Sequence, residues 1–347
     1  MRAQEVKLTQ PEMEKKHVTV TAHKKSLWQE IYRNRWSYIY LVPMIILLLA
    51  FIVYPIFASL GYTLYQWNGI GDPTAYVGLD NFKKVTTDPI FWESFIHTFI
   101  FTAVVVPVQL TLALILALIL NSTKLRFATF YRSVYFLPVV MSPAVIGVIM
   151  NLMISNFGDN FNTIFLKLHL INQHIDWLAD PRFVLWIIIA IQIWNTLGIN
   201  MVYFLAGLQT IPTELYEAAR IDGAGWAAQF FSITIPMLRG VGMIILFLAI
   251  LGNLNVFDLV QVLTGGGPYF ASNVVSTYIY QQAFGGFSVG GSGGGGVVQP
   301  NVGFASAASF FFGLILIVLT SFQALGWRYV RRNGARTATS ATETGAA

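Results

Sequence analysis

Six long apolar runs constrain this chain more than any other feature of its sequence. They cover approximately residues 39–63, 95–120, 133–154, 184–208, 240–263 and 304–327. A helix that rises 1.5 Å per residue needs about 20 apolar residues to cross about 30 Å of hydrocarbon, and each run is long enough. Only 11% of the 347 residues are charged, whereas a soluble protein has about 25%. The sequence therefore predicts an all-α integral membrane protein with six transmembrane helices.

The third run is less regular than the others. Pro138, Ser142 and Pro143 interrupt it. Proline has no backbone N–H, but membrane helices tolerate it where neighbouring helices satisfy the freed carbonyl groups. We therefore count residues 133–154 as a span, the least regular of the six.

The basic residues predict the orientation of the spans. If all six runs cross the membrane, residues 64–94, 155–183 and 264–303 lie on one side, and both chain ends lie on the other with the two remaining connections. Of the 21 Lys and Arg residues, 17 fall on the side of the chain ends and 4 on the opposite side. Because basic residues are enriched in cytoplasmic loops, we expect the N and C termini to be cytoplasmic, and Lys83 and Ser272 to lie outside.

Composition divides the rest of the chain. We expect residues 1–37 to form a cytoplasmic N-terminal tail and residues 38–330 to form the transmembrane domain. Within that domain lie a polar cytoplasmic loop at 209–238 and a glycine-rich extracytoplasmic insertion at 285–303. The insertion has no lysine, so a flexible linker fits it better than a phosphate-binding loop. Residues 337–347 are small and polar, and we expect residues 331–347 to form a disordered C-terminal tail.

The residues that catalysis or metal binding needs are sparse. The chain has no cysteine, which excludes disulfides and thiolate metal sites. His169 and His174 are five residues apart and lack the further ligands that a metal needs. None of the common hydrolase or metalloprotease motifs appears at membrane depth. We therefore expect a non-catalytic membrane subunit that binds neither a metal nor a cofactor.

One polar stretch, Pro212 to Pro236, separates the fourth and fifth runs and reads P-T-E-L-Y-E-A-A-R-I-D-G-A-G-W-A-A-Q-F-F-S-I-T-I-P. We expect a first short helix capped by Thr213, with acidic residues in its first turn. Gly223 is placed to end it in a left-handed conformation. Gly225 opens a second short helix, which Pro236 is expected to stop. An ordinary helical loop would show the same pattern.

The spacing within this stretch is more specific than its composition. E-A-A, two further residues, D-G-A and a later I-x-I-P resemble the EAA motif of permease subunits of binding-protein-dependent ABC importers; the family's usual ending is Leu-Pro, and Ile235 departs from it. The resemblance implies the type I permease fold and a coupling helix that docks on a separate ATPase. The residues implied in this coupling are Glu214, Glu217, Ala218, Ala219, Asp222, Gly223, Ala224 and Pro236.

Three further strings resemble the sugar-permease branch of that family. They are F-D-L-V-Q-V-L-T-G-G-G-P at Phe257–Pro268, S-T-Y-I-Y-Q-Q-A-F at Ser276–Phe284 and G-F-A-S-A-A-S at Gly303–Ser309. The likeness is to the first permease subunit of maltose and glycerol-phosphate importers. It implies import of a sugar, oligosaccharide or sugar-like polyol or glycerol phosphate across a bacterial or archaeal plasma membrane. It also implies a second permease in a heterodimer, two ATPase subunits that hold ATP and magnesium, and an extracytoplasmic sugar-binding protein.

Polar and aromatic residues within the spans suggest a path for a hydroxyl-rich solute. On a regular helix Asn253, Val256, Phe257 and Val260 share one face, whereas Asn255 and Asp258 lie on another. We expect the Asn253 face to contact the solute, because it combines an amide with an aromatic ring. Each polar residue taken singly also fits a hydrogen bond between helices. The predicted path comprises Trp194, Asn195, Gly198, Asn253, Phe257 and Ser306.

The main alternative is a secondary, ion-coupled transporter. Such proteins normally show an internal repeat and use a relay of ionisable residues through the membrane. The chain shows no convincing repeat. Its ionisable residues near the spans are limited to Asp258, Glu93 and His97, too few for a relay, which favours the importer subunit.

Overall fold

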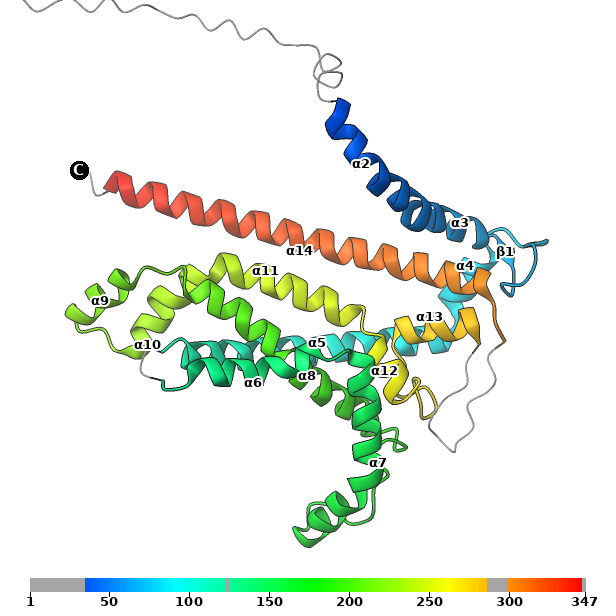
Figure 1. Ribbon diagram of the computed structural model, residues 1–347, viewed down its shortest axis with the longest axis horizontal. Helices are drawn as coiled ribbons and strands as arrows, with labels where there is room; N and C mark the ends of the chain where they lie inside the picture. Colours follow the sequence, from blue (N-terminus) through cyan, green and yellow to red (C-terminus); the bar gives the residue numbers. More distant parts are fainter. Residues whose placement is uncertain (1–34, 123–124, 286–298, 345–347) are drawn as a thin grey trace, which may run out of the picture. The chain divides into compact units, whose positions relative to one another are not determined.

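The structure, a computed structural model, describes residues 35–122, 125–285 and 299–344 of the chain (Figure 1). The chain forms two compact units, Met1–Phe57 and Ala58–Ala347. In the first unit, helix α2 (Arg35–Leu48) continues into the π-helix η1 (Leu49–Val53) and the start of α3 (Tyr54–Tyr62). These residues are mostly apolar, and Trp36–Tyr62 forms one candidate span.

The second unit is helical apart from one two-stranded antiparallel hairpin, in which β1 (Tyr65–Gln66) pairs with β2 (Ala75–Tyr76). Its helices are α4 (Asp80–Thr87), α5 (Pro89–Leu120), α6 (Ala128–Val140), α7 (Pro143–Lys167), α8 (Val184–Leu208), α9 (Thr213–Ile221), α10 (Trp226–Gln229), the π-helix η2 (Phe230–Thr234), α11 (Ile235–Leu254), α12 (Asp258–Leu263), α13 (Val275–Phe284) and α14 (Val302–Thr344).

Helix α5 shows how a long apolar sequence becomes a packed span. Its N-terminus is fixed by Asp88, whose carboxylate accepts hydrogen bonds from the backbone N–H groups of Ile90 and Phe91, and Pro89 occupies the first helical position. The Tyr278 hydroxyl on α13 donates to the same carboxylate at 2.5 Å. Burial raises the pKa of Tyr278, which keeps the hydroxyl protonated as a donor. This pair ties α13 to the start of α5.

Three apolar clusters hold the second unit together. One joins α5, α8 and α11 around Met201, and a second joins α5, α7, α8 and α12 around Ile188 and Val260. The third joins α4, α5, α13 and α14 around Phe91 and Tyr278. Because α5 contributes to all three clusters, it is the central helix of the unit.

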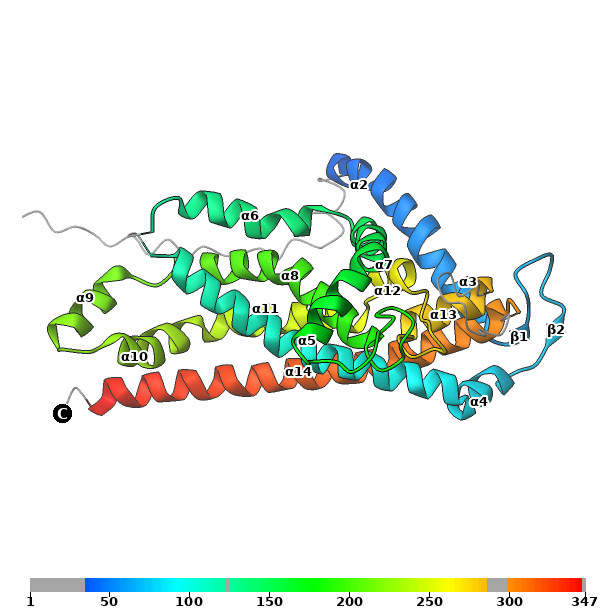
Figure 2. The same ribbon diagram turned by 90° about the horizontal axis from the view of Figure 1, so that it is seen from below.

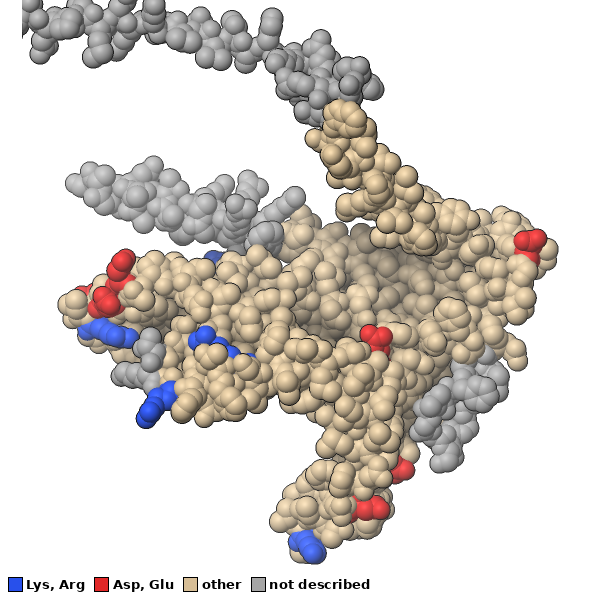
Figure 3. Space-filling model, in the orientation of Figure 1, with Lys and Arg blue, Asp and Glu red and all other residues tan. Residues whose placement is uncertain are grey.

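Most connections that the sequence assigns to the same side lie at the same end of the second unit, whereas α7 and the loop after it project away from the other helices (Figures 1 and 2). In Figures 1 and 2 the α5–α6 connection, α9 and α10 lie at one end, and the hairpin, α4, α12 and α13 lie towards the other. On the face shown in Figure 3, charged side chains gather over the α9–α10 end and the far tip of α7, and few lie over the helices between. A band with few charges between two polar ends is the arrangement that a bilayer requires.

Five of the six predicted spans are single candidate spans in the structure. They are Trp36–Tyr62, Pro89–Leu120, Val184–Leu208, Trp226–Leu263 and Val302–Gly326. The third run instead forms α6 and α7, which bend by 93° at the break between them. The break falls at Met141–Ser142, directly before Pro143, so the irregularity expected there is confirmed, and the described spans number five or, if the bent pair counts as one, six.

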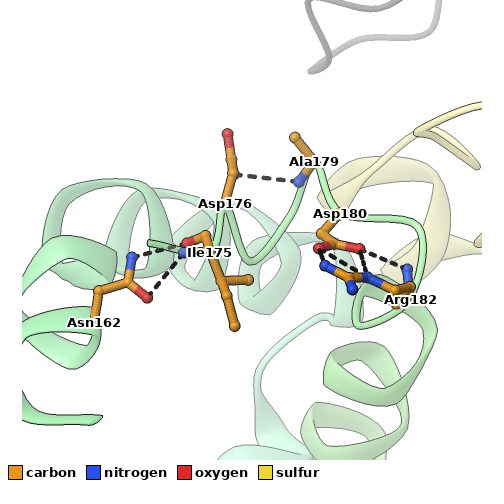
Figure 4. Close-up of polar contacts among 6 residues, drawn as sticks. All are labelled: Asn162, Ile175, Asp176, Ala179, Asp180 and Arg182. Carbon is orange, nitrogen blue, oxygen red and sulfur yellow. Dashed lines mark hydrogen bonds and ion pairs between the residues drawn. The ribbon is translucent and has the colours of Figure 1, made fainter. Parts of the chain in front are cut away.

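The loop between α7 and α8 is shorter than the sequence suggested, because α7 continues to Lys167 instead of ending near residue 154. The loop folds back on α7 through Asn162, whose side chain both donates to and accepts from the backbone of Ile175 (Figure 4). Nearby, Arg182 makes hydrogen bonds to Asp180, and these lower the pKa of that carboxyl. Side-chain bonds therefore hold the loop at its middle and close to the start of α8.

Both π-helices immediately precede a proline. Leu49–Val53 is followed by Tyr54-Pro55, and Phe230–Thr234 by Ile235-Pro236. Proline removes a backbone donor and its ring clashes with the preceding turn, and a π-turn makes room for one extra residue in that turn. The prediction that Pro236 stops a helix is therefore wrong, since the helical chain continues from α10 through η2 into α11.

The structure corrects one other expectation, places Ser272 in the interior and leaves two regions open. Helix α14 continues to Thr344, so no helix end marks the boundary predicted at residue 330; the sequence there contains no proline to stop it. Ser272 is fully buried and bonded to Thr264 and to the carbonyl of Gly267, so it is not an exposed loop residue. Residues 1–34 of the predicted tail and 286–298 of the predicted insertion lie outside the described residues.

Candidate functional site

The α9–α10 loop, defined here as Pro212–Pro236, consists of two short helices joined by a sharp turn. Gly223 has φ = +79°, and its N–H donates to the carbonyl of Arg220, while Ala224 N–H donates to Ala219. This is the glycine-ended helix that the sequence predicts, because a residue with a Cβ is strained at this φ. Gly225 then caps α10 in an extended conformation, with φ = −70°.

Two side-chain contacts brace the loop. The Tyr216 hydroxyl on α9 lies 2.9 Å from the hydroxyl of Thr234, which is buried in η2. Gln229 donates from its side chain to the carbonyl of Ala224 at 2.8 Å. The first contact connects α9 to η2, the π-helix that continues into α11, so α9 is bonded directly to the base of the fifth span.

Two details of the predicted first helix are wrong. Pro212, not Thr213, is the N-cap residue, and no side chain caps the helix. Glu214 lies in the first turn, but Glu217 lies beyond it. The proline forces an extended residue at the boundary, which places Thr213 one position too late to serve as the cap.

The outer surface of the α9–α10 loop combines charge with exposed apolar groups. Glu214, Glu217, Ala218, Asp222 and Gly223 are exposed, and Ala219 and Ala224 are half-buried. Ile221 is 87% exposed, and Trp226, which stacks on Phe230 with ring centroids 5.5 Å apart, is 72% exposed. Large apolar side chains left exposed in a polar loop are typical of a surface that binds another protein.

A second candidate site lies where the fifth span breaks. Helix α11 ends at Leu254 and α12 begins at Asp258, so the span is not the regular helix that the sequence analysis assumed. Asn253 is buried; its side chain donates to the carbonyl of Ala249 and accepts from Gln192 at 3.3 Å. The ring of Phe257 packs against Tyr280 of α13, with ring centroids 5.2 Å apart.

The break therefore places Phe257 beside Asn255 instead of Asn253. Both residues line a hollow of about 430 Å³ between the break, α13 and α14. Tyr280, Phe284, Ser276 and Ser309 line it as well. The expectation that Asn253 and Phe257 share one face is wrong, because it depended on an unbroken helix.

The predicted path residues of α8 lie at its crossing with α6. Asn195 is buried and donates to the carbonyl of Pro138 at 2.9 Å. A Cβ on Gly198 would lie 2.2 Å from the carbonyl oxygen of Tyr135, so only glycine allows the two helices to approach so closely. Trp194 remains 44% exposed. Asn195 and Gly198 thus have structural partners, whereas Trp194 presents its ring outward.

Ser306 lies in a different part of the unit. It is buried near the start of α14 and accepts a hydrogen bond from Ser59 at 3.0 Å. The predicted path residues therefore do not form one continuous lining among the described residues. Within the part of the chain that the structure describes, no three His, Cys, Asp or Glu side chains are arranged to hold a metal ion.

Sequence reasoning passed over residues that the structure brings together. Tyr280 and Phe284 lie four residues apart in the string Ser276–Phe284, which placed them on one helix face. That face meets the break, with Tyr280 ring centroids 5.2 Å from Phe257 and 5.1 Å from Phe284. Helical spacing was the available signal for this pair, whereas nothing local indicated Asn255.

Comparison with known proteins gives a consistent result. A model of the family "binding-protein-dependent transport system inner membrane component" matches residues 88–331. The lactose transport system permease protein LacF of Rhizobium radiobacter is 34% identical over 305 residues, which is 87% of this chain and 97% of that protein. The arabinooligosaccharides transport system permease protein AraP of Bacillus subtilis is 31% identical over 308 residues, covering 88% and 93%.

A solved structure shares the fold. It is the crystal structure of a bacterial ABC transporter involved in the import of the acidic polysaccharide alginate; one chain aligns over 86% of this chain and 96% of its own length, with a TM-score of 0.69 and 22% identity. At that identity the likeness concerns the fold alone.

Proposed function

The chain belongs to the family of binding-protein-dependent transport system inner membrane components, and from this membership we propose that it is the permease subunit of an ABC importer that carries a carbohydrate into the cytoplasm. Its several candidate spans make it a multi-pass plasma-membrane protein. The carbohydrate assignment is supported by the lactose and arabinooligosaccharide permeases that it resembles.

The observation that carries the proposal is the exposed surface of the α9–α10 loop. We assign ATPase contact to its two acidic residues of α9, to the small residues beside them and to the Gly223 turn. Ile221 and Trp226 supply apolar area that a docked subunit would bury. The coupling residues assigned here are Glu214, Glu217, Ala218, Ala219, Asp222, Gly223, Ala224 and Pro236.

A docked ATPase would act on the span through a continuous helix. The helical chain runs from Trp226 through η2 and α11 to Leu254, roughly 40 Å at 1.5 Å per residue. It ends at the break beside the hollow. The Tyr216–Thr234 contact joins α9 to this helix, so a displacement of the loop by ATPase closure is passed to the break.

The orientation and partners follow the same proposal. We place both termini and the α9–α10 loop in the cytoplasm, because 17 of the 21 basic residues lie on that side. The working importer then contains a second permease in a heterodimer, two ATPase subunits and an extracytoplasmic sugar-binding protein. ATP and magnesium bind the ATPases, and this chain hydrolyses nothing.

We also propose that Trp194, Asn195, Gly198, Asn253, Phe257 and Ser306 belong to the substrate path, in two different ways. Trp194 and Phe257 offer partly exposed rings that a solute can contact. Asn195, Gly198, Asn253 and Ser306 are buried in helix contacts, so they act by fixing the helices that border the path.

The test is reconstitution of the chain with the permease, ATPase and binding protein encoded beside it. We expect uptake of the sugar captured by the binding protein to require internal ATP and to persist when ion gradients are collapsed. The ATPase should also co-purify with the chain. Uptake that needs an ion gradient and continues without ATP would establish the secondary transporter instead.

A further inference from the structure

The hollow beside the α11–α12 break has the size of a ligand site. Its volume of about 430 Å³ lies within the range of about 300–1,000 Å³ that is typical of small-molecule pockets. It is open on one side and lined by residues from the break, α13 and α14. Three distant parts of the sequence thus contribute to one concave surface.

Three aromatic rings form a row along the hollow. The ring of Tyr280 lies between those of Phe257 and Phe284, with centroid distances of 5.2 Å and 5.1 Å. Tyr280 is 40% exposed and Phe284 is 70% exposed. The rings are tilted by 51° and 46° to one another, so they form a curved platform, and the face of each ring can receive the apolar C–H face of a sugar ring.

The polar groups around this platform keep hydrogen-bonding capacity within the described residues. Ser309 donates its hydroxyl to the carbonyl of Ala305 and can still accept a hydrogen bond. Asn255 uses its side-chain N–H to donate to Leu251, which leaves its carbonyl oxygen free. Neither the Tyr280 hydroxyl nor the Ser276 hydroxyl makes a hydrogen bond to the described part of the chain. Free donors and acceptors of this kind can form hydrogen bonds with the hydroxyl groups of a ligand, which an apolar ligand does not offer.

The electrostatics of the hollow select among such ligands. Among the described residues, no Lys or Arg lines it, and the charged residue next to it in the chain is the acidic Asp258. Carboxylated or phosphorylated sugars are normally recognised by Arg or Lys. An anion would therefore enter this hollow without a compensating charge.

We propose that the hollow formed by Asn255, Phe257, Ser276, Tyr280 and Ser309 is a binding site for a neutral sugar ring, and that it excludes acidic and phosphorylated sugars. The proposal rests on the carbohydrate importer function proposed above and narrows its substrate class. It assigns the aromatic row to stacking and the free amide and hydroxyl groups to hydrogen bonds with the sugar.

The natural absence of cysteine allows a direct test. The variant Ser276→Cys is assembled with its partner permease and ATPases in nanodiscs, and its reaction with a hydrophilic maleimide is timed. Neutral lactose or maltotriose is expected to slow labelling about tenfold when its free concentration is about ten times its Kd. An alginate-derived mannuronate disaccharide at the same concentrations is expected to leave the rate unchanged. If Ser276→Cys does not assemble, Ser309→Cys reports on the opposite wall.

A second substitution separates binding from stability. Tyr280→Ala is combined with Ser276→Cys. In this double variant the apparent Kd of lactose or maltotriose for protection should rise about tenfold, because the middle ring of the row is lost. Tyr203→Ala is the matched control, since Tyr203 is also 40% exposed but lies on α8 away from the hollow. It should leave protection unchanged.

The outcomes distinguish this site from the importer function itself. Protection by the mannuronate disaccharide, protection by none of these sugars, or equal effects of Tyr280→Ala and Tyr203→Ala would overturn the site. ATP-driven uptake of a carbohydrate without protection overturns the site and leaves the importer function standing. Protection by a neutral sugar without any ATP-driven uptake supports the site and overturns the importer function.

Discussion

The turn in the α9–α10 loop and the break between α11 and α12 interrupt helices for different reasons. The turn is caused locally, by Gly223 at φ = +79° and by Gly225 as the next N-cap. The break contains neither a proline nor a residue with positive φ; Asn255 has φ = −101° and Phe257 has φ = −143°. Contacts with distant residues hold it instead.

Those contacts come from α7. Asn151 donates to the carbonyl of Leu263 at 2.8 Å. A Cβ on Gly147 would lie 3.1 Å from Val262, so the absence of a side chain there lets α12 pack closely on α7. Helix α12 packs on α7, whereas α11 packs on α5 and α8. The span therefore breaks between α11 and α12. The turn is therefore determined by its own residues, whereas the break is determined by packing against other helices.

The largest effect is expected at the local turn. Gly223→Asp places a Cβ in the left-handed region, at a cost of about 1 kcal/mol or more, and redirects α9 relative to α10. We expect membrane insertion to be retained, ATP-driven uptake to be abolished and co-purification of the ATPase to be weakened. Uptake assays in proteoliposomes and quantitative pull-down measure these effects.

Gly225→Asp is the matched control for that change. It adds the same charge to the same loop, but at an N-cap position with ordinary φ and no atom within 4 Å of the added Cβ, where aspartate is favourable. Uptake should be close to that of the natural chain. If both variants lose uptake equally, charge and not the turn geometry is responsible.

The next contrast concerns the two ends of the molecule. Ile70, beside the β-hairpin, is 81% exposed, and Ile221, in the α9–α10 loop, is 87% exposed. In intact cells an impermeant thiol reagent should label Ile70→Cys and should leave Ile221→Cys unlabelled until the membrane is opened. Labelling of Ile221→Cys in intact cells would place the loop outside and remove its contact with an ATPase.

How far the sequence predicts the structure depends on the same distinction. The spans, the glycine turn and the irregularity near Pro143 were predictable because apolar length, glycine and proline act within a few residues. The partners of Asn195 and Asn253 were not, since an amide suits a solute and a neighbouring helix equally well in sequence. The hollow could not be predicted from the sequence either, because it forms only where the span breaks, and that break depends on packing against α7.

A smaller effect is expected from the two asparagines beside the break. Asn253→Ala removes the acceptor of the Gln192 side chain, and leaving that group unpaired should cost about 1–3 kcal/mol of stability. Asn255→Ala removes an exposed side chain and should change stability by less than about 0.5 kcal/mol, while it weakens sugar protection in the maleimide assay. Thermal unfolding in nanodiscs measures the first effect. Equal losses of stability in the two variants would contradict the assignment of Asn253 to packing and Asn255 to the hollow.

The smallest effect tests the contact that joins the loop to α11. Tyr216→Phe removes the hydroxyl that faces the buried Thr234, and Thr234→Val removes the other partner. A buried hydrogen bond contributes about 0.5–1.5 kcal/mol. Tyr216→Phe leaves Thr234 only its 3.5 Å bond to the carbonyl of Gln229, and Thr234→Val leaves the Tyr216 hydroxyl without this partner. The double variant should therefore lose less stability than the sum of the two single losses. If the contact also transmits motion, each variant should lower uptake per ATP hydrolysed while the ATPase remains bound. Additive losses of stability with unchanged coupling would show that α9 and α11 act independently, and that the continuous helix alone connects the loop to the break.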